Sequence, residues 1–334
     1  FRFFLVSIMP DGKDIIYDES RLKGYQAFCN KIYNTARYLL MNTPEDYTVP
    51  ANRPELSKID LYVLDELYAT IEKCDAALAG FHFSDYALAI YEFLWKTFCD
   101  QYIEMSKVAL KDAKLKDGAL FTLYTVFSAA LKMLHPVMPF ITEAIWQRVK
   151  PLAGKAGASI MMQKYPTPDT ARIDPAAEAD VNWIKEVIMG LRNIRGELNV
   201  SPGKPISVLL QNGHRDDRER VSRFDGFLKA LARLDSLQWL NEGEAPLAAT
   251  ALVGDMTLLV PLKGLVDVQA EVNRLNKEID KLNAEAARLD AKLNNEAFTA
   301  RAPEDVVAKE REKLADCQKA MAQLNEQMQR IKAL

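Results

Sequence analysis

The apolar residues of the first 150 positions recur at helical intervals almost throughout. The first clear stripe steps by three and four residues along one helix face, and it consists of Tyr25, Cys29, Ile32, Ala36 and Leu39. Asn42-Thr43-Pro44 should end this helix, because proline lacks an amide donor and restricts the residue before it. An amphipathic helix is therefore predicted close to the start of the chain.

Capping residues and apolar spacing predict two further helices. One begins after Ser57, a suitable N-cap, and ends at Gly80. The next is capped by Ser84 or Asp85 and continues through Met105. It carries so many aromatic residues that much of its circumference should be buried. We therefore expect this third helix to be the central helix of a bundle.

A fourth helix starts near Gly118 and meets Pro136 and Pro139. Missing amide donors and ring clashes should kink or break it there, before a helical pattern resumes over residues 141–149. Four to five helices of this kind predict a helical bundle over residues 14–150.

The composition changes after Pro151, and Gly, Ala, Pro and Asp dominate residues 151–180. This stretch is predicted to be a linker with one short strand at residues 159–162. A helix is expected over residues 180–200. Short strands are expected at 206–210, 237–240 and 256–261, with a helix at 218–234 between the first two. Residues 151–264 are therefore predicted to form a linker and a small α+β subdomain.

Residues 265–334 show two stretches of heptad-like apolar spacing. These positions are Leu275, Ile279, Leu282, Ala286, Leu289 and Leu293, then Leu314, Cys317, Met321, Leu324, Met328 and Ile331. The break between them, residues 294–303, contains a proline and is too short to let the helices lie parallel. An antiparallel coiled-coil hairpin is predicted, with arms about 38 Å long at 1.5 Å per residue.

Composition narrows the function classes. No stretch approaches the eighteen or more apolar residues of a membrane span, so we expect a cytoplasmic protein with no membrane partner. The four cysteines lie far apart, which suggests neither a zinc site nor a disulfide framework. A net charge of −3 argues against a coating of cations for non-specific nucleic-acid binding. No DNA partner is expected, and any RNA site must be local.

Catalytic motifs are absent from these 334 residues. There is no Gly-x-x-x-x-Gly-Lys-Ser/Thr loop, no Gly-x-Gly-x-x-Gly, no Gly-x-Ser-x-Gly and no His-Glu-x-x-His. The three histidines, His82, His135 and His214, are scattered over different predicted elements. We therefore predict no catalytic residue, no metal site and no cofactor within this chain.

The first amphipathic helix carries a polar face that the bundle would leave free. Asn30, Asn34 and Arg37 fall at i, i+4 and i+7 opposite the apolar stripe, and Lys31 lies at their margin. Asparagine can read base edges, and arginine can clamp phosphates or stack on an unstacked base. These four residues are candidate RNA contacts. The alternative interpretation is an ordinary solvated helix face.

Two further groups of cations are candidates. Arg192 and Arg195 lie on the side of their helix away from Ile188 and Leu191, where they could contact phosphates. Intramolecular pairing with a carboxylate such as Glu197 is the alternative. Near the tip of the hairpin, the candidates are Arg301, Lys309 and Arg311. They alternate with acidic residues, so they could also be ordinary coiled-coil flanks.

Several runs resemble valyl-tRNA synthetases, a family of class I aminoacyl-tRNA synthetases. The start of their anticodon-binding domain is similar to Tyr25-x-x-Phe28-Cys29-Asn30-Lys31-Ile32-Tyr33-Asn34-x-x-Arg37-Tyr38. Later blocks are similar to Tyr91-Glu92-Phe93-Leu94-Trp95 and Leu134-His135-Pro136-x-Met138-Pro139-Phe140. The family's tRNA-binding arm is similar to Arg301-Ala302-Pro303-x-x-Val306-Val307-x-x-Glu310-Arg311. Tyr33, Gln101 and Tyr62 stand where the family commonly has tryptophan, mostly at packing positions.

This resemblance covers essentially the whole chain and implies a region that grips tRNA(Val). It implies that the bundle reads the anticodon region and that the hairpin braces the outer corner of the L. The family's full enzyme attaches valine to tRNA with ATP through an N-terminal catalytic domain, and it also has an editing domain. Their His-Ile-Gly-His and Lys-Met-Ser-Lys-Ser signatures are missing here. We therefore expect residues 1–13 to be a remnant of that junction, and the chain to be an inactive monomer by itself.

Two other interpretations stay open. The His-Pro block is shared with isoleucyl- and leucyl-tRNA synthetases, although isoleucine enzymes often end in a cysteine-ligated zinc module that is absent here. The same heptads would also suit a coiled-coil scaffold that docks a protein partner.

Overall fold

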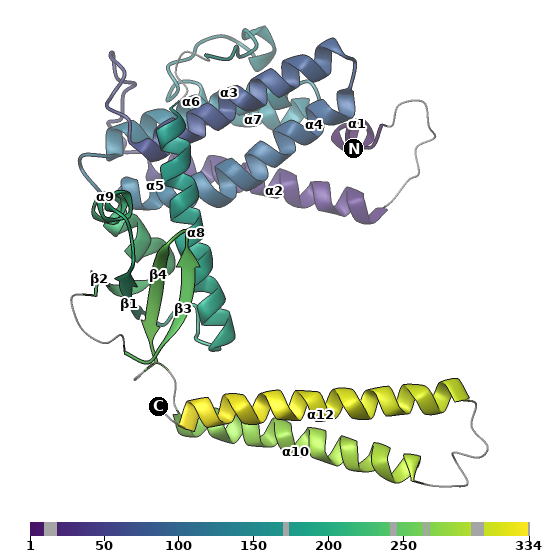
Figure 1. Cartoon of the computed structure of the whole chain (residues 1–334). Helices are drawn as coiled ribbons and strands as arrows, with labels where there is room; N and C mark the ends of the chain where they lie inside the picture. Colours follow the sequence, from purple (N-terminus) through teal and green to yellow (C-terminus); the bar gives the residue numbers. More distant parts are fainter. Residues whose placement is uncertain are drawn as a thin grey trace. The chain divides into compact units, whose positions relative to one another are not determined.

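A computed structural model describes residues 1–9, 19–169, 174–240, 246–262, 265, 268–294 and 304–332. These residues form two compact units. The first contains Phe1–Ile188 and Arg218–Ala232, and the second contains Met189–Asp217 and Arg233–Leu334. Helices dominate, and the strands form one four-stranded sheet, so the predicted mainly α fold with a small α+β part is confirmed (Figure 1). Within the described ranges, no helix combines the length and the apolar character that crossing a bilayer requires.

The first unit begins with a helical bundle (Figure 1). Its helices are α1 (Arg2–Ser7), α2 (Glu19–Asn42), α3 (Lys58–Ala79), α4 (Phe83–Glu92), the π-helix η1 (Phe93–Tyr102), α5 (Ile103–Ala109), α6 (Lys116–Leu134) and α7 (Pro139–Val149). Helix α3 begins as predicted, because the Ser57 hydroxyl accepts the Asp60 amide while the Asp60 carboxylate accepts the Ser57 amide. Gly80 is its C-cap.

The predicted third helix differs from expectation in three respects. Its N-cap is His82, which makes no side-chain capping bond, so the expected cap at Ser84 or Asp85 is wrong. Ten residues in its middle form the wider turns of a π-helix. It is also not the most buried helix. Helix α6 is buried around nearly its whole circumference, because small residues such as Ala119, Ala129 and Ala130 let neighbouring helices approach.

The break at the two prolines is confirmed. Helix α6 ends at Leu134, and α7 restarts at Pro139, where proline's missing amide donor costs nothing at the first helical position. The strand predicted at residues 159–162 is wrong, because a short 3-10 helix, η2 (Ile160–Met162), stands there. The Ile160 amide donates to the Glu143 carboxylate at 3.0 Å, so a side chain on α7 takes the place of a strand partner.

A mixed sheet forms the α+β part of the second unit. Helix α8 (Pro175–Glu197) precedes it. The strands are β1 (Ile206–Gln211), β2 (Leu234–Trp239), β3 (Ala248–Val253) and β4 (Met256–Pro261), in the order β2-β1-β4-β3. Strands β1 and β2 are parallel, and α9 (Arg215–Ala232) is the crossover that a parallel pair requires.

Strand β3 was not predicted from the sequence. It lies at the edge of the sheet and is only partly buried, and its Leu252 side chain is exposed, so no clear apolar alternation marks it. Gly190 on α8 sits close to this sheet. A Cβ there would lie 3.2 Å from the Cβ of Ala251 and 3.3 Å from Cδ1 of Leu258. Glycine therefore lets α8 pack closely on β3 and β4.

The C-terminal part is a hairpin of two long helices, α10 (Val268–Leu293) and α12 (Glu304–Lys332), which run side by side in opposite directions (Figure 1). Ile279, Leu289 and Cys317 are buried between them, at predicted heptad positions. Lys292 near the end of α10 pairs with Glu310 near the start of α12 at 3.3 Å. The antiparallel hairpin is therefore confirmed, and we refer to it as the arm.

Candidate nucleic-acid interface

Helix α2 separates an apolar face from a polar one. Phe28, Ile32 and Leu39 are almost completely buried in the bundle. Asn30, Asn34 and Arg37 are exposed on the opposite side, and none of their side chains makes a hydrogen bond or ion pair within the part of the chain that the structure describes. Their amide and guanidinium groups are therefore free to meet a ligand.

Lys31 sits at the edge of this face and is already engaged. Its ammonium lies 4.0 Å from the centre of the Trp95 ring and pairs with the Asp100 carboxylate. Both partners belong to the π-helix η1, so Lys31 braces α2 against η1. An RNA phosphate would have to compete with Asp100 for this charge.

Two further side chains extend the polar face. Tyr33 is 55% exposed and Met41 is 76% exposed. On α2, Tyr33 follows Asn30 by three residues and precedes Arg37 by four, so all three point to the same side. The expectation that Tyr33 is a packing position is therefore wrong, whereas Tyr62 is buried as expected. The spacing of four residues between Tyr33 and Arg37 was the signal in the sequence that could have placed Tyr33 on the exposed face.

We call Asn30, Tyr33, Asn34, Arg37 and Met41 the α2 face. It spans about 16 Å along the helix at 1.5 Å per residue. It combines an aromatic ring, two amides and a guanidinium, which are the groups that stack on and hydrogen-bond to unpaired bases. The α2 face is therefore suited to single-stranded RNA.

The two arginines of α8 have different environments. Arg192 is exposed. Arg195 is only 8% exposed, and its guanidinium donates to the carbonyl oxygens of Ser201 at 3.2 Å, Lys204 at 2.7 Å and Arg233 at 3.0 Å. Three of its hydrogen bonds therefore go to backbone carbonyls, whereas the sequence had suggested pairing with a carboxylate. It joins the end of α8 to the start of the sheet, and this arrangement does not favour an RNA contact.

A buried carboxylate on α8 also has partners within the first unit. Asp180 accepts from Arg220 Nε at 2.9 Å and from Arg223 Nη1 at 2.8 Å. These bonds fix α9 to the first half of α8.

The arm presents exposed cations near the start of α12. Lys309 and Arg311 are exposed. Glu310 between them accepts from Lys292 and Lys313, each at 3.3 Å, and these bonds hold the pKa of its carboxyl below the usual value. Arg301, the third predicted arm contact, lies outside the described residues.

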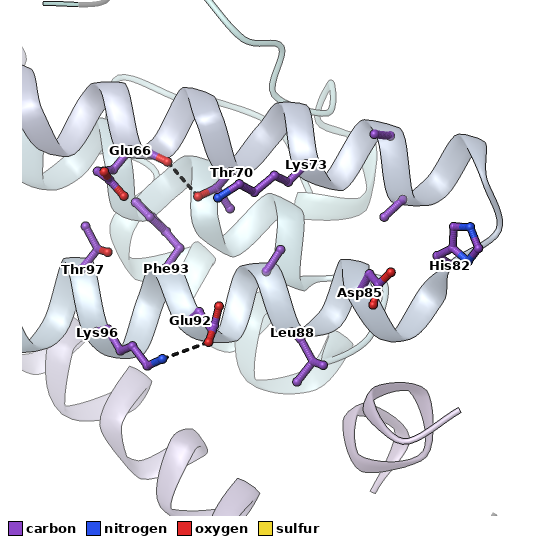
Figure 2. A pocket seen from close by; sticks show the side chains of 13 residues that line it. Glu66, Thr70, Lys73, His82, Asp85, Leu88, Glu92, Phe93, Lys96 and Thr97 are labelled. Atoms are coloured by element: carbon purple, nitrogen blue, oxygen red, sulfur yellow. Dashed lines mark hydrogen bonds and ion pairs between the residues drawn. The ribbon is translucent and has the colours of Figure 1, made fainter. Parts of the chain in front are cut away.

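A groove of about 630 Å³ runs between α3 and the helix formed by α4 and η1 (Figure 2). Its charged lining is mixed: α3 contributes Glu66 and Lys73, and the α4–η1 helix contributes Asp85, Glu92 and Lys96. Lys96 pairs with Glu92 at 2.9 Å, as the dashed line in Figure 2 marks. With three carboxylates against two lysines, this groove is unsuited to a phosphate backbone.

Two protein-family models match the chain. Residues 60–210 match the anticodon-binding domain of tRNA ligases. Residues 267–332 match the valyl tRNA synthetase tRNA-binding arm. The chain belongs to the valyl-tRNA synthetases. It is the C-terminal, tRNA-binding region of such an enzyme, its domains are those of aminoacyl-tRNA ligases, and tRNA is its partner.

The matched ranges cover some of the candidate contacts. Arg192 and Arg195 lie in the range of the anticodon-binding domain, and Lys309 and Arg311 lie in that of the valyl-tRNA synthetase arm. Helix α2 precedes the first range, which begins at Asp60. The case for the α2 face therefore rests on its exposure and chemistry.

Proposed function

We propose that this region of a valyl-tRNA synthetase holds tRNA(Val) at two places. The α2 face contacts the unpaired bases of the anticodon region, and the arm braces the outer corner of the L. The observation that carries this proposal is the α2 face itself, where amide and guanidinium groups without partners among the described residues lie beside an exposed tyrosine on one helix. Unpaired anticodon bases need such stacking and hydrogen-bonding groups.

The enzyme to which this region belongs attaches valine to tRNA(Val) with ATP and acts in the cytoplasm. We expect the chain by itself to bind tRNA without aminoacylating it, because its 334 residues hold no nucleotide-binding or catalytic motif. We also propose that it is a monomer. Residues 14–150, together with helix α1, form the anticodon-binding bundle, residues 151–264 the linker and α+β subdomain, and residues 265–334 the arm.

Each candidate residue has a distinct proposed role. On the α2 face, Asn30, Asn34 and Arg37 contact bases and phosphates, and Tyr33 stacks on a base. Lys31 orients α2 against η1 and adds positive charge at the margin. Four further cations contact the tRNA backbone: Arg192, Arg301, Lys309 and Arg311. Arg195 holds the fold through the three carbonyls that it binds.

The proposal is tested by titrating the chain with valine tRNA and with a non-cognate tRNA at several salt concentrations. Binding should prefer the valine tRNA, and the logarithm of affinity should fall linearly with the logarithm of salt concentration. Light scattering should give the mass of a monomer. Equal affinity for both tRNAs, or a mass that rises with concentration and no RNA binding, would contradict the proposal.

Variants of the α2 face localise the contact. Arg37→Ala should weaken valine tRNA binding by about 1–3 kcal/mol. Arg37→Lys should restore part of the loss if the contact is to phosphate, and little of it if the planar guanidinium stacks on a base. The matched control is Lys73→Ala, which removes one exposed positive charge from α3 of the same bundle. If both alanine variants lose affinity equally, only general electrostatics is involved.

Tyr33 tests the stacking role separately. Tyr33→Ala should cost about 1–3 kcal/mol of binding, whereas Tyr33→Phe keeps the ring and should retain most of the affinity. Because Tyr33 is largely exposed, both variants should unfold at the same urea concentration as the unmodified chain. Full affinity in Tyr33→Ala would exclude this residue from the interface.

A further inference from the structure

Among the residues that the structure describes, a small pocket of the first unit is lined by cations and by no carboxylate. Its volume is about 360 Å³, and it lies between the start of α1, the end of α6 and the segment around η2. Arg2, Lys132 and His135 contribute its charged or titratable side chains, and Gln163 contributes an amide. This lining differs from the mixed charges of the groove in Figure 2.

Lys132 has no counter-ion in the described part of the chain. It is partly buried in α6, and this burial together with nearby Lys155 lowers the pKa of its ammonium. Arg2 donates one N–H to the Pro136 carbonyl at 3.3 Å, so the other N–H groups of its guanidinium are available to a ligand. A partly buried ammonium without an anion is costly, and a bound anion would relieve that cost.

His135, which also lines this pocket, has a ring nitrogen without a hydrogen-bond partner among the described residues. The Thr142 hydroxyl donates to the Met138 carbonyl at 2.8 Å, so it accepts from His135 Nδ1–H at 2.8 Å. This bond leaves Nε2, which is buried and has no hydrogen-bond partner among the described residues. In the neutral ring, Nε2 carries a lone pair. In the protonated ring, it is a donor.

The nearest acid does not fill the pocket. The Glu143 carboxylate faces His135, but it accepts from Gln147 Nε2, from Ser159 Oγ at 2.9 Å and from the Ile160 amide at 3.0 Å. Arg2, Lys132 and Lys155 together outweigh this single negative charge. The local field therefore favours an anion.

We propose that this pocket binds a phosphate-like oxyanion through Arg2, Lys132 and the protonated Nε2–H of His135, and that His135 takes up a proton when the anion binds. The shared chemistry is a tetrahedral oxyanion, supplied either by an RNA backbone phosphate or by a free phosphate compound. The pocket is independent of the α2 face and the arm.

Proton uptake gives the site a characteristic pH dependence. In the empty pocket, burial lowers the pKa of His135, and Arg2 lowers it further, while Glu143 opposes this. The ring is then neutral at pH 7, and its bare Nε2 would repel an oxyanion. An anion beside it favours the charged ring, so binding should tighten as the pH falls.

Inorganic sulfate is the probe, because its charge does not change between pH 8 and pH 6. Calorimetry of the full chain should show saturable binding that tightens on the order of tenfold between these pH values. Lys132→Met keeps the apolar stem and should weaken binding by about tenfold. His135→Asn keeps a group beside Thr142 but has no Nε2, and it should abolish the pH effect. Lys107→Met, at an exposed position of α5, is the control and should bind as the unmodified chain does.

Titration of the same variants with valine tRNA separates the two sources of the anion. If an RNA phosphate occupies the pocket, Lys132→Met should weaken tRNA binding and reduce the salt slope by about one. If the anion is free, tRNA binding stays unchanged while sulfate binding is lost. No saturable sulfate binding, or binding that both substitutions leave intact, would overturn the proposal. Neither result depends on whether the α2 face reads the anticodon.

Discussion

Replacing Arg195 with methionine should destabilise the second unit without weakening tRNA binding directly. The guanidinium is buried and donates to three backbone carbonyls, those of Ser201, Lys204 and Arg233. These carbonyls belong to the turn after α8 and to the residue just before β2. Methionine fills a similar volume as the arginine stem, so the substitution mainly removes the three charge-assisted bonds.

The expected size of the effect follows from these contacts. A hydrogen bond to a charged group contributes about 1.5–3 kcal/mol, and three bonds from one guanidinium are not additive. Two of the three carbonyls keep a backbone donor, since Ser201 O also accepts from the Lys204 amide and Arg233 O from the Ile206 amide. Methionine also avoids burying a charge. We expect a net loss of about 2–4 kcal/mol in the free energy of unfolding of this unit.

Hydrogen exchange measured by mass spectrometry at increasing urea concentrations gives the assay, because it reports on β1 and β2 separately from the bundle. With a urea slope of about 2 kcal/mol per molar, the midpoint for these strands should fall by about 1–2 M. The control is Arg192→Met, which changes an exposed arginine one turn earlier on α8 and should leave the midpoint within error.

Two results would refute this reasoning. Unchanged exchange in β1 and β2 would mean that the three carbonyl bonds contribute no net stability. An unchanged midpoint with a loss of tRNA affinity would mean that Arg195 leaves its carbonyls to bind phosphate, as the sequence alone had suggested.

Further predictions concern ion pairs in the two units. Asp180→Ala should lower the free energy of unfolding of the first unit by about 2–3 kcal/mol, because it leaves the partly exposed Arg220 and Arg223 without their carboxylate. Asp225→Ala breaks only an exposed pair and should lower it by about 0–1 kcal/mol. Urea denaturation of the two variants measures this difference. The pKa of Glu310 is lowered by its two lysine partners, so its contribution to arm stability is present above pH 4.5 and lost as the pH falls through the lowered pKa. Glu310→Gln should flatten this acid loss of helicity, measured by circular dichroism, and an unchanged acid transition would disprove it.

The helices could be predicted because their signals are local. The apolar stripe of α2, the capping box at Ser57 and the prolines after His135 each act within a few residues, where periodicity and missing donors decide the outcome. The arm followed from heptads and a short proline-containing break. Edge strand β3 was missed because a partly buried edge carries little apolar alternation.

The sequence by itself determined the bundle, the arm, the family and the positions of the α2 candidates on one helix face. Only the tertiary structure decided which of the candidates are available to RNA. Lys31 and Arg195 look like any surface cation in the sequence, yet Lys31 meets Trp95 and Asp100 from 64 and 69 residues away in η1, and Arg195 meets the carbonyl of Arg233 from beyond α9. The burial of a side chain depends on the distant segment that packs over it. Helical periodicity predicts the face on which a residue lies, but not the segment that covers that face.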